Sequence, residues 1–346
     1  MKENIKVIIW GPGAMGGGMA RMLLKKKGVE IVGAIGNRSA GKNFYEHIGV
    51  EQGDRPDIII GREEDVIRPG AADIVMLATD SFTKVSMPKM RTILENKMNC
   101  ITTAEEMAYP KAQSPKEAEE LDRLAKENGV TILGTGINPG LIMDLLVLIW
   151  TGCMEDVEEI TSRRVNSLSP FGGLVMHEQG VGISVEEFNE RKAAGKMTGH
   201  VGFAESVRMI ADGIGWELDK FEQDMSPIIT DVDRKSPHGF AAAGSLAGVA
   251  MTAEGYVDGV AKIHMDHPQQ IEPEQVGIST GDYVYIKGSP NVNMANSPEI
   301  EGGIGTYAMC VNMIPHVINA APGLVTMLDL PVPRAIMGDM RDLIKE

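Results

Sequence analysis

The sequence has little cysteine and no long hydrophobic run. Its three cysteines, Cys100, Cys153 and Cys310, lie far apart and form no CxxC pair. This pattern argues against a disulfide framework and a structural zinc site and fits a reducing cytosol, so we expect no metal and a cytoplasmic protein. The longest apolar stretch, Leu141–Trp150, contains Asp144 and is too short to span a bilayer.

Cations are also scarce relative to anions. The 33 Lys and Arg residues against 48 Asp and Glu residues give a formal net charge of −15. Nucleic-acid binders and proteins that dock on anionic membranes need clustered cations, so we expect neither kind of partner. The charge does not exclude an anionic ligand, because backbone N–H groups and one or two arginines can hold a phosphate.

Glycine, by contrast, is abundant, with 40 residues among 346. Three of them form a GxGxxG pattern directly after the apolar run Ile5–Trp10, at the start of a segment with helical spacing. In such a pattern the first glycine permits a tight turn, the second lets the backbone approach a pyrophosphate, and the third allows close helix–strand contact. We therefore predict that the diphosphate of a dinucleotide lies on this helix N-terminus. The residues expected to bind it are Gly11, Gly13, Ala14, Met15 and Gly16.

The residues after the next expected strand bear on the choice of nucleotide. An Asp or Glu that binds the ribose is expected about 20 residues past the glycines, but the sequence there reads Gly36-Asn37-Arg38-Ser39. Arg38 can pair with a 2′-phosphate, and Asn37 and Ser39 can donate hydrogen bonds. We predict NADP as the cofactor, with NAD tolerated. The alternative for Arg38 is an ordinary solvated arginine.

Strands and helices alternate over the first 140 residues. This order predicts an α/β fold with a Rossmann-type, doubly wound parallel sheet. The expected strands are 5–10, 29–35, 73–78, 99–103 and 130–134, and the expected helices are 15–27, 87–96 and 114–128. A chain of this length is expected to form about two domains. We expect the first, at residues 1–145, to be a dinucleotide-binding domain.

After about residue 150 the pattern changes to that of a second, α+β domain. The expected strands are 157–165, 259–264 and 283–287, and the expected helices are 186–194, 202–213 and 306–320, with an Ala/Gly-rich segment at 238–253. We assign residues 146–300 to substrate binding and dimerisation. A homodimer is expected because an exposed sheet face needs covering and symmetric dimers are the common solution.

Three polar segments end expected strands, where open α/β sheets place their ligands. They are Ala78–Ser81, Thr102–Glu106 and Gly134–Gly140. The residues expected near the cofactor are Ala78, Thr79, Thr103, Asn138 and Pro139.

The middle segment carries a carboxylate pair. An alkylammonium has a pKa of about 10.4 and cannot release hydride until it loses a proton. A carboxylate beside it can accept that proton, stabilise an iminium and activate water. Glu105 and Glu106 are the candidates for this catalytic role. The alternative is that both simply favour the N-terminus of a short helix.

The sequence also contains several longer motifs, which are WGPGAMGGGMARML, TTAEEMAYP, GTGINPGLIMDLL, HEQGVGISVEEF, GHVGFAESVRMIADGIGW and VNMIPHVINAAPGLVTMLDLPVPR. Together they resemble those of the 2,4-diaminopentanoate dehydrogenases and related native amine dehydrogenases, whose N-terminal domain is similar to that of dihydrodipicolinate reductase. The resemblance implies reversible oxidative deamination, with the C4 amine of the diamino acid converted to give 2-amino-4-oxopentanoate.

The same resemblance implies roles for individual residues. It places the catalytic carboxylate in TTAEE, where we favour Glu105 over Glu106, and it places His200 in the substrate pocket. It also implies that the segment 301–346 returns to the dinucleotide-binding domain.

Further polar residues follow an expected strand of the second domain and are candidates to hold a substrate carboxylate. They are Arg163, Arg164, Asn166 and Ser167, and for each arginine a solvated strand end is the alternative. His264 and His267 are three residues apart on a strand and would face opposite sides, which disfavours a metal site. The substrate is expected to be a small amine or diamino acid.

Two other functions remain open. One is an imine reductase like dihydrodipicolinate reductase, which typically has a shorter chain and a basic HHxxK-type motif that this sequence does not contain. The other is a dinucleotide-sensing protein without turnover, which would need no proton acceptor.

Overall fold

The computed structural model describes residues 3–345. The chain forms two compact units, Met1–Leu141 with Gly302–Glu346, and Ile142–Glu301. The sequence analysis placed the first boundary at residue 145. Asp144 explains the difference, because its carboxylate accepts hydrogen bonds from Leu145 N and Ser206 Oγ and so ties residues 142–145 to the second unit. No helix among residues 3–345 is long and apolar enough to cross a membrane.

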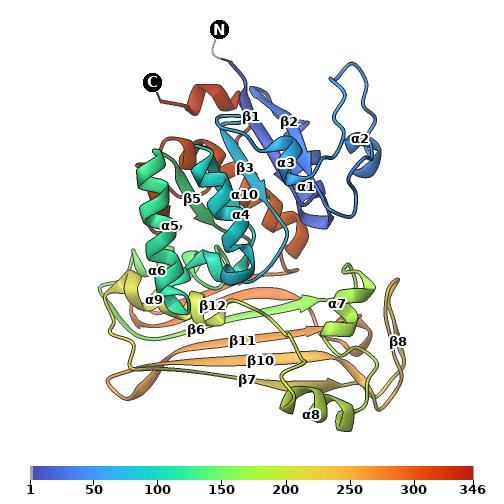
Figure 1. Ribbon diagram of the computed structural model, residues 1–346. Coiled ribbons are helices and arrows are strands. Elements are labelled where there is room, and N and C mark those ends of the chain that lie inside the picture. The colour runs from blue at the N-terminus through green and yellow to red at the C-terminus, as the bar shows by residue number, and fades with distance from the viewer. Residues whose placement is uncertain (1–2, 346) are drawn as a thin grey trace. The chain divides into compact units, whose positions relative to one another are not determined.

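The first unit is built on a six-stranded parallel sheet (Figure 1). Its strands are β1 (Ile5–Trp10), β2 (Val29–Ile35), β3 (Ile74–Leu77), β4 (Asn99–Thr102), β5 (Thr131–Gly134) and β14 (Gly323–Val325). Their order is β2-β1-β3-β4-β5-β14, so the direction of winding reverses between β1 and β3. Ligands bind at such switch points, outside the carboxyl ends of the strands. The predicted Rossmann-type sheet is confirmed.

Helices cover both faces of this sheet. They are α1 (Ala14–Leu23), α2 (Phe44–His47), α3 (Glu63–Val66), α4 (Thr83–Glu95), α5 (Pro115–Asn128) and α10 (Gly302–Ile318), with 3₁₀ turns η1 (Glu105–Ala108), η2 (Pro110–Ala112) and η4 (Met340–Leu343). Helices α1 and α10 pack on one another, and α4 packs on α5 (Figure 1). The close approach of α1 to α10 requires glycine, since a Cβ on Gly18 would lie 2.3 Å from the Tyr307 ring.

One helix start in this unit differs from expectation. Helix α4 begins at Thr83, whereas the sequence placed the start near Pro88. The hydrogen bond from Ser86 N to Phe82 O, 3.0 Å long, shows that helical bonding is established before the proline. Pro88 therefore lies inside the helix.

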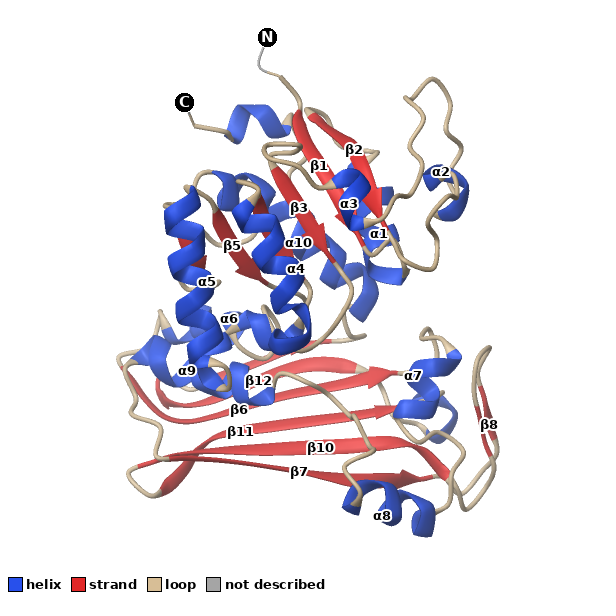
Figure 2. Ribbon diagram, in the orientation of Figure 1, coloured by secondary structure: helices blue, strands red, loops and turns tan. Residues whose placement is uncertain are grey.

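The second unit contains a six-stranded mixed sheet (Figure 2). Its strands are β6 (Asp156–Ser167), β7 (Lys220–Ile229), β10 (Leu246–Val257), β11 (Val260–Gln270), β12 (Gly281–Ser289) and β13 (Val292–Asn296), beside a small hairpin of β8 (Arg234–Lys235) and β9 (Phe240–Ala241). The order is β13-β12-β6-β11-β10-β7, and β6 with β11 is the parallel pair. Helical segments are α6 (Leu145–Thr151), α7 (Gly173–Glu178), α8 (Val185–Ala193), α9 (Phe203–Ile214) and the 3₁₀ turn η3 (Pro273–Val276).

One face of this sheet is covered by α9, which packs on β10 and β11. A Cβ on Gly255 would lie 2.6 Å from Val207 of this helix, so the glycine permits the close packing. The Ala/Gly-rich segment that received no strand in the sequence analysis holds β10, whose small residues make it a poor match to a β-branched strand pattern.

Candidate functional site

The turn between β1 and α1 has the geometry that the GxGxxG pattern predicts. Gly11 adopts φ +92°, and a Cβ there would lie 2.4 Å from Ala78 O. At Gly16 a Cβ would lie 2.1 Å from Gly11 O, so this glycine allows helix and strand to meet. At Gly13 a Cβ would have no heavy atom within 4 Å. The first and third glycines therefore serve the fold, and the second leaves open space where a diphosphate can approach.

The helix that follows is able to receive an anion. Gly13 is its N-cap and supplies no side-chain cap, and the first turn carries no acidic residue. Ala14 is exposed and Met15 is half-buried. The first amides of a helix point outward and carry partial positive charge, which favours a phosphate. The residues present thus fit the diphosphate of a dinucleotide.

The turn after β2 leaves Arg38 accessible. Asn37 and Arg38 are exposed, whereas Ser39 is buried, with its Oγ 2.4 Å from where a Cβ on Gly36 would lie. Within residues 3–345 Arg38 has no hydrogen bond or ion pair. Its guanidinium is available for a ligand, and Ser39 instead packs the turn.

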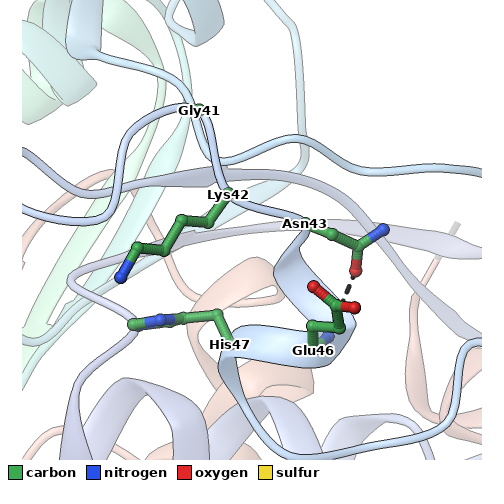
Figure 3. Close-up of a pocket in the computed structure, with 5 residues that line it drawn as sticks. All are labelled: Gly41, Lys42, Asn43, Glu46 and His47. Carbon is green, nitrogen blue, oxygen red and sulfur yellow. Dashed lines mark hydrogen bonds between the residues drawn. The ribbon is translucent and has the colours of Figure 1, made fainter.

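A hollow open to solvent follows this turn (Figure 3). It is lined by Gly41, Lys42, Asn43, Glu46 and His47. Lys42 and His47 extend to the same side of the hollow (Figure 3), while Asn43 Oδ1 accepts a 3.1 Å hydrogen bond from Glu46 N at the start of α2. Lys42 thus supplies a cation on that side of the hollow, and Glu46 an anion in the same lining.

The ends of β3 and β4 meet the glycine turn. Ala78 N donates to Trp10 O at 2.8 Å, and Thr103 N donates to Leu77 O at 3.1 Å, so the parallel ladder continues past the strands. Thr79 is exposed, and its Oγ1 accepts a 3.0 Å hydrogen bond from Lys89 Nζ. Gly11, Ala78 and Thr79 therefore come together at the switch point, with Thr103 one strand further along.

Glu105 and Glu106 follow β4 in the turn η1 but have different surroundings. The Glu106 carboxylate accepts a 2.7 Å hydrogen bond from Thr83 N at the first turn of α4. It therefore acts as a capping anion for that helix. Glu105 is half-buried, and its carboxylate accepts from the Ser81 hydroxyl and from its own backbone N–H. Burial raises the pKa of Glu105 despite these hydrogen bonds, and the charge of Glu106 raises it further.

The loop after β5 packs against η1. Asn138 is half-buried and Pro139 is buried. A Cβ on Gly134 would lie 2.2 Å from the backbone of Met107, so the glycine lets η1 rest directly on the end of β5. This contact fixes the position of the turn that carries Glu105.

In the second unit, a buried polar cluster surrounds His200. Its ring lies 4.8 Å from the ring of His267 and 5.0 Å from that of Phe203, measured between centroids. Asn166 Oδ1 lies 3.0 Å from His267 Nε2, and Asn166 Nδ2 donates to Ser167 O. His267 Nε2 therefore carries the proton, and its Nδ1 is an acceptor.

Both histidines of this cluster are neutral at physiological pH. Burial, aided by the nearby charge of Arg164, lowers the pKa of His200 to about 3. Burial also lowers the pKa of His267 well below its usual value. His200 Nε2 and His267 Nδ1 are enclosed and have no partner among the described residues. Such atoms normally bind water or a ligand.

Sequence reasoning missed most of this cluster. Gln179 Oε1 and Gln269 Nε2 are further enclosed atoms without a partner in the described chain. The expected strand ended at His264, but β11 continues to Gln270 through Pro268. In the structure Met265, His267 and Gln269 are buried in alternation with less buried residues. His267 and Gln269 are polar, so the apolar alternation that indicates a strand ends at Met265 in the sequence and gave no signal for them.

The candidate carboxylate-binding arginines are already paired. Arg163 points to the opposite face from Arg164 and forms a 2.7 Å ion pair with Asp266. Arg164 is buried and contacts the carboxylates of Asp282 at 2.5 Å and Glu299 at 3.3 Å. Neither guanidinium is free to hold a substrate.

Glu299 links the buried Arg164 to Ser167. Its Oε1 accepts a 2.7 Å hydrogen bond from Ser167 N. Burial raises the pKa of Glu299 to about 7, against the opposing effects of that hydrogen bond and of Arg164. Ser167 is thus held at the end of β6.

Comparisons with known proteins assign the chain to a family. Residues 141–346 match the family model described as the 2,4-diaminopentanoate dehydrogenase C-terminal domain. A 2,4-diaminopentanoate dehydrogenase of Acetoanaerobium sticklandii is 66% identical over 346 residues, covering 99% of this chain and 98% of that protein.

Two amine dehydrogenases are similar over nearly the whole chain. The structure of that from Mycobacterium smegmatis superimposes with a TM-score of 0.84 at 25% identity, over 97% of this chain and 98% of the other. An amine dehydrogenase of Streptomyces virginiae is 23% identical, over 96% of this chain and 98% of its own. The chain belongs to the 2,4-diaminopentanoate dehydrogenase family.

Proposed function

We propose that this enzyme oxidatively deaminates 2,4-diaminopentanoate at its C4 amine, giving 2-amino-4-oxopentanoate and ammonia, in a reversible reaction that uses NADP in preference to NAD. The 66% identical relative carries that substrate in its name. The observation in this chain that supports the chemistry most strongly is the environment of Glu105, a carboxylate at the ligand-binding edge of the sheet with a raised pKa.

Glu105 is the better candidate for the proton acceptor. Glu106 is engaged by Thr83 N and serves α4. Glu105 has only hydroxyl and backbone donors, and the burial that raises its pKa makes it a stronger base when ionised. We assign Glu105 the catalytic role on this difference.

The carboxylate would act at each proton transfer. Ionised Glu105 holds the C4 ammonium by charge and takes one of its protons, leaving a neutral amine. A bound nicotinamide supplies the hydride acceptor for the C4 hydrogen, and the substrate becomes an iminium. Once that proton has been released, the Glu105 carboxylate stabilises the cation and then accepts a proton from the water that attacks C4. Loss of ammonia from the carbinolamine leaves the ketone.

The preference for NADP rests on the turn after β2. Arg38 has no partner in residues 3–345, and no carboxylate at 36–39 repels a 2′-phosphate. Asn37 is exposed beside it, and Lys42 adds a second cation to the same loop. A planar guanidinium binds phosphate in bidentate fashion.

The substrate side of the proposal uses His200 with Asn166 and Ser167. Neutral His200 and His267 present enclosed nitrogens that can accept hydrogen bonds from an ammonium or a water. Asn166 fixes the tautomer of His267 and so keeps one acceptor directed away from itself. Arg163 has no part in this site, because Asp266 neutralises it.

We also propose a homodimer that buries the open face of the second sheet. Along β10 the residues alternate between buried and partly exposed, and the exposed face carries Tyr283 and Tyr285, stacked 6.2 Å apart. Analytical ultracentrifugation of the wild type and of Tyr285→Asp tests this, with the dimer expected for the first and weakened for the second.

A substrate panel tests the reaction. The purified protein is mixed with NADP or NAD and with either 2,4-diaminopentanoate or pentan-2-amine. In a separate assay it is mixed with the reduced cofactor and dihydrodipicolinate. Near-ultraviolet absorbance reports the reduced nicotinamide in both assays. Turnover with the diamino acid is expected. Turnover with the cyclic imine alone would make the protein an imine reductase, and binding of nucleotide without any turnover would make it a sensor.

A further inference from the structure

The second unit contains five arginines, and four of them have an acidic partner. The pairs are Arg163 with Asp266, Arg164 with Asp282 and Glu299, Arg191 with Glu187, and Arg208 with Asp212. Arg234, at the start of the β8–β9 hairpin, is the fifth. Among residues 3–345 it has no ion pair.

Arg234 is nevertheless buried, with 3% of its surface exposed. Its Nε donates to Thr230 Oγ1 at 2.8 Å, and its Nη1 donates to Gln270 Oε1 at 2.6 Å and to Ile271 O at 3.2 Å. All three acceptors are neutral. Burial lowers the pKa of Arg234, and exposed Asp231 offsets this only in part, from beyond ion-pair distance.

A guanidinium in this setting lacks a counter-ion. Buried charges in proteins are normally paired, because desolvation is costly. Arg164, equally buried, shows the usual solution in this same unit, with two carboxylates on its terminal nitrogens. Nη2 of Arg234 has no partner in the described chain and is not one of its fully enclosed polar atoms. One edge of the fork therefore remains open to an anion.

The position of Arg234 indicates which anion. Gln270, which anchors its Nη1, pairs with Ser167 across the β6–β11 ladder. Leu168 N donates to Gln270 O at 2.8 Å. Arg234 is thus fixed beside the strand end where Asn166 and Ser167 lie, the residues assigned above to the substrate.

We propose that Arg234 binds the carboxylate of the amino-acid substrate and so selects diamino acids over simple amines. The inference rests on the proposed function, since it names a contact of that substrate. Three neutral anchors hold Nε and Nη1, and the carboxylate accepts from Nη2 and supplies the missing negative charge. A substrate without the carboxylate would gain nothing from this residue.

The test compares two substrates that share the reacting end. Arg234→Gln and Arg234→Lys are assayed with 2,4-diaminopentanoate and with pentan-2-amine, which keeps the amine and methyl group but has no carboxylate. For Arg234→Gln we expect KM for the diamino acid to rise about 10- to 100-fold, since a charge-assisted contact is lost, with KM for pentan-2-amine unchanged. Arg234→Lys keeps the positive charge but not the forked guanidinium, so its KM for the diamino acid should lie between those of the wild type and Arg234→Gln.

Arg208→Gln is the matched control, because that arginine lies on α9 and is paired with Asp212 in solvent. It should leave both substrates unaffected. An equal loss for both substrates in Arg234→Gln would overturn the proposal and leave Arg234 as a fastener of the hairpin. A change of oligomeric state with unchanged KM would also overturn it, since the anion would then come from a second copy.

A binding measurement covers the case in which Arg234→Gln does not fold. Calorimetry of the Arg234→Lys protein with saturating NADP and 2-aminopentanoate, which has the carboxylate but no C4 amine, should show weaker binding than the wild type. Its amide, 2-aminopentanamide, should bind both proteins alike, and equal affinities for the acid would overturn the proposal. Wild-type protein that does not oxidise 2,4-diaminopentanoate would instead refute the proposed function.

Discussion

The two neighbouring glutamates of η1 allow a test of the catalytic assignment, because the same substitution should lower kcat at Glu105 and only slightly lower stability at Glu106. In Glu105→Gln the side chain keeps its size but can no longer accept a proton. In Glu106→Gln the amide oxygen can still accept from Thr83 N, 2.7 Å away in the parent protein, and only the negative charge at the start of α4 is lost.

The magnitudes follow from these environments. A positioned general base contributes about 10²- to 10⁴-fold, so kcat of Glu105→Gln should fall by that factor, equivalent to about 3 to 5 kcal/mol of activation free energy. A charge at a helix N-terminus contributes about 0.3–1 kcal/mol. Glu106→Gln should therefore lower the free energy of unfolding by no more than that and leave kcat within about threefold of the wild type.

The pH dependence of kcat/KM gives a second, independent test of the roles of the two glutamates. Catalysis needs ionised Glu105, so kcat/KM falls as the pH drops through its raised pKa. The charge of Glu106 contributes to that elevation, and its removal in Glu106→Gln should move the acid limb to lower pH. Steady-state kinetics across pH, with urea unfolding of each variant, measures both effects. If Glu106→Gln loses kcat as severely as Glu105→Gln, the assignment of roles is wrong.

Three further outcomes are expected. Arg38→Ala should weaken NADP binding about 10- to 100-fold and NAD binding little, by fluorescence titration. Gly13→Ala should weaken dinucleotide binding without lowering Tm, whereas Gly16→Ala, whose Cβ would meet a carbonyl at 2.1 Å, should lose about 1–3 kcal/mol of stability. Below pH 6.5, unfolded chains bind protons that buried His200 and His267 refuse, so the wild type should lose more stability on acidification than His267→Gln, by about 1.4 kcal/mol per pH unit.

Local patterns predicted the first sheet well because each strand there is a short apolar run bounded by turn residues. Strands β1 and β2 have the expected limits, Ile5–Trp10 and Val29–Ile35. The second sheet was harder to predict, since its long strands contain residues that usually end strands. Pro268 lies within β11. Asp266 and Gln269 on either side are paired with β6, but the two residues between them are not. The neighbouring strands tolerate the missing N–H, which sequence alone does not reveal.

The candidate site was likewise predictable from the sequence only in part. The GxGxxG pattern predicts a particular backbone geometry, and the structure shows the tight turn at Gly11 and the close helix–strand approach at Gly16, with open space beside Gly13. The difference between Glu105 and Glu106 depends on Thr83, more than 20 residues earlier in the chain. A helix whose start was expected near Pro88 offered no reason to place that amide beside Glu106. The error in the helix limit and the ambiguity of the glutamates therefore have one cause.

Two arginines are placed to receive negative charge from a ligand. In the second unit each of Arg163, Arg164, Arg191 and Arg208 has an acidic partner, whereas Arg234 has no ion pair among the described residues. Arg38, in the first unit, has neither an ion pair nor a hydrogen bond within the described chain. One is exposed on the turn after a Rossmann strand, and the other is buried on neutral anchors. Both positions suit negative charge carried by a ligand, phosphate at the first and carboxylate at the second, which fits the proposed NADP-dependent oxidation of an amine that also carries a carboxylate.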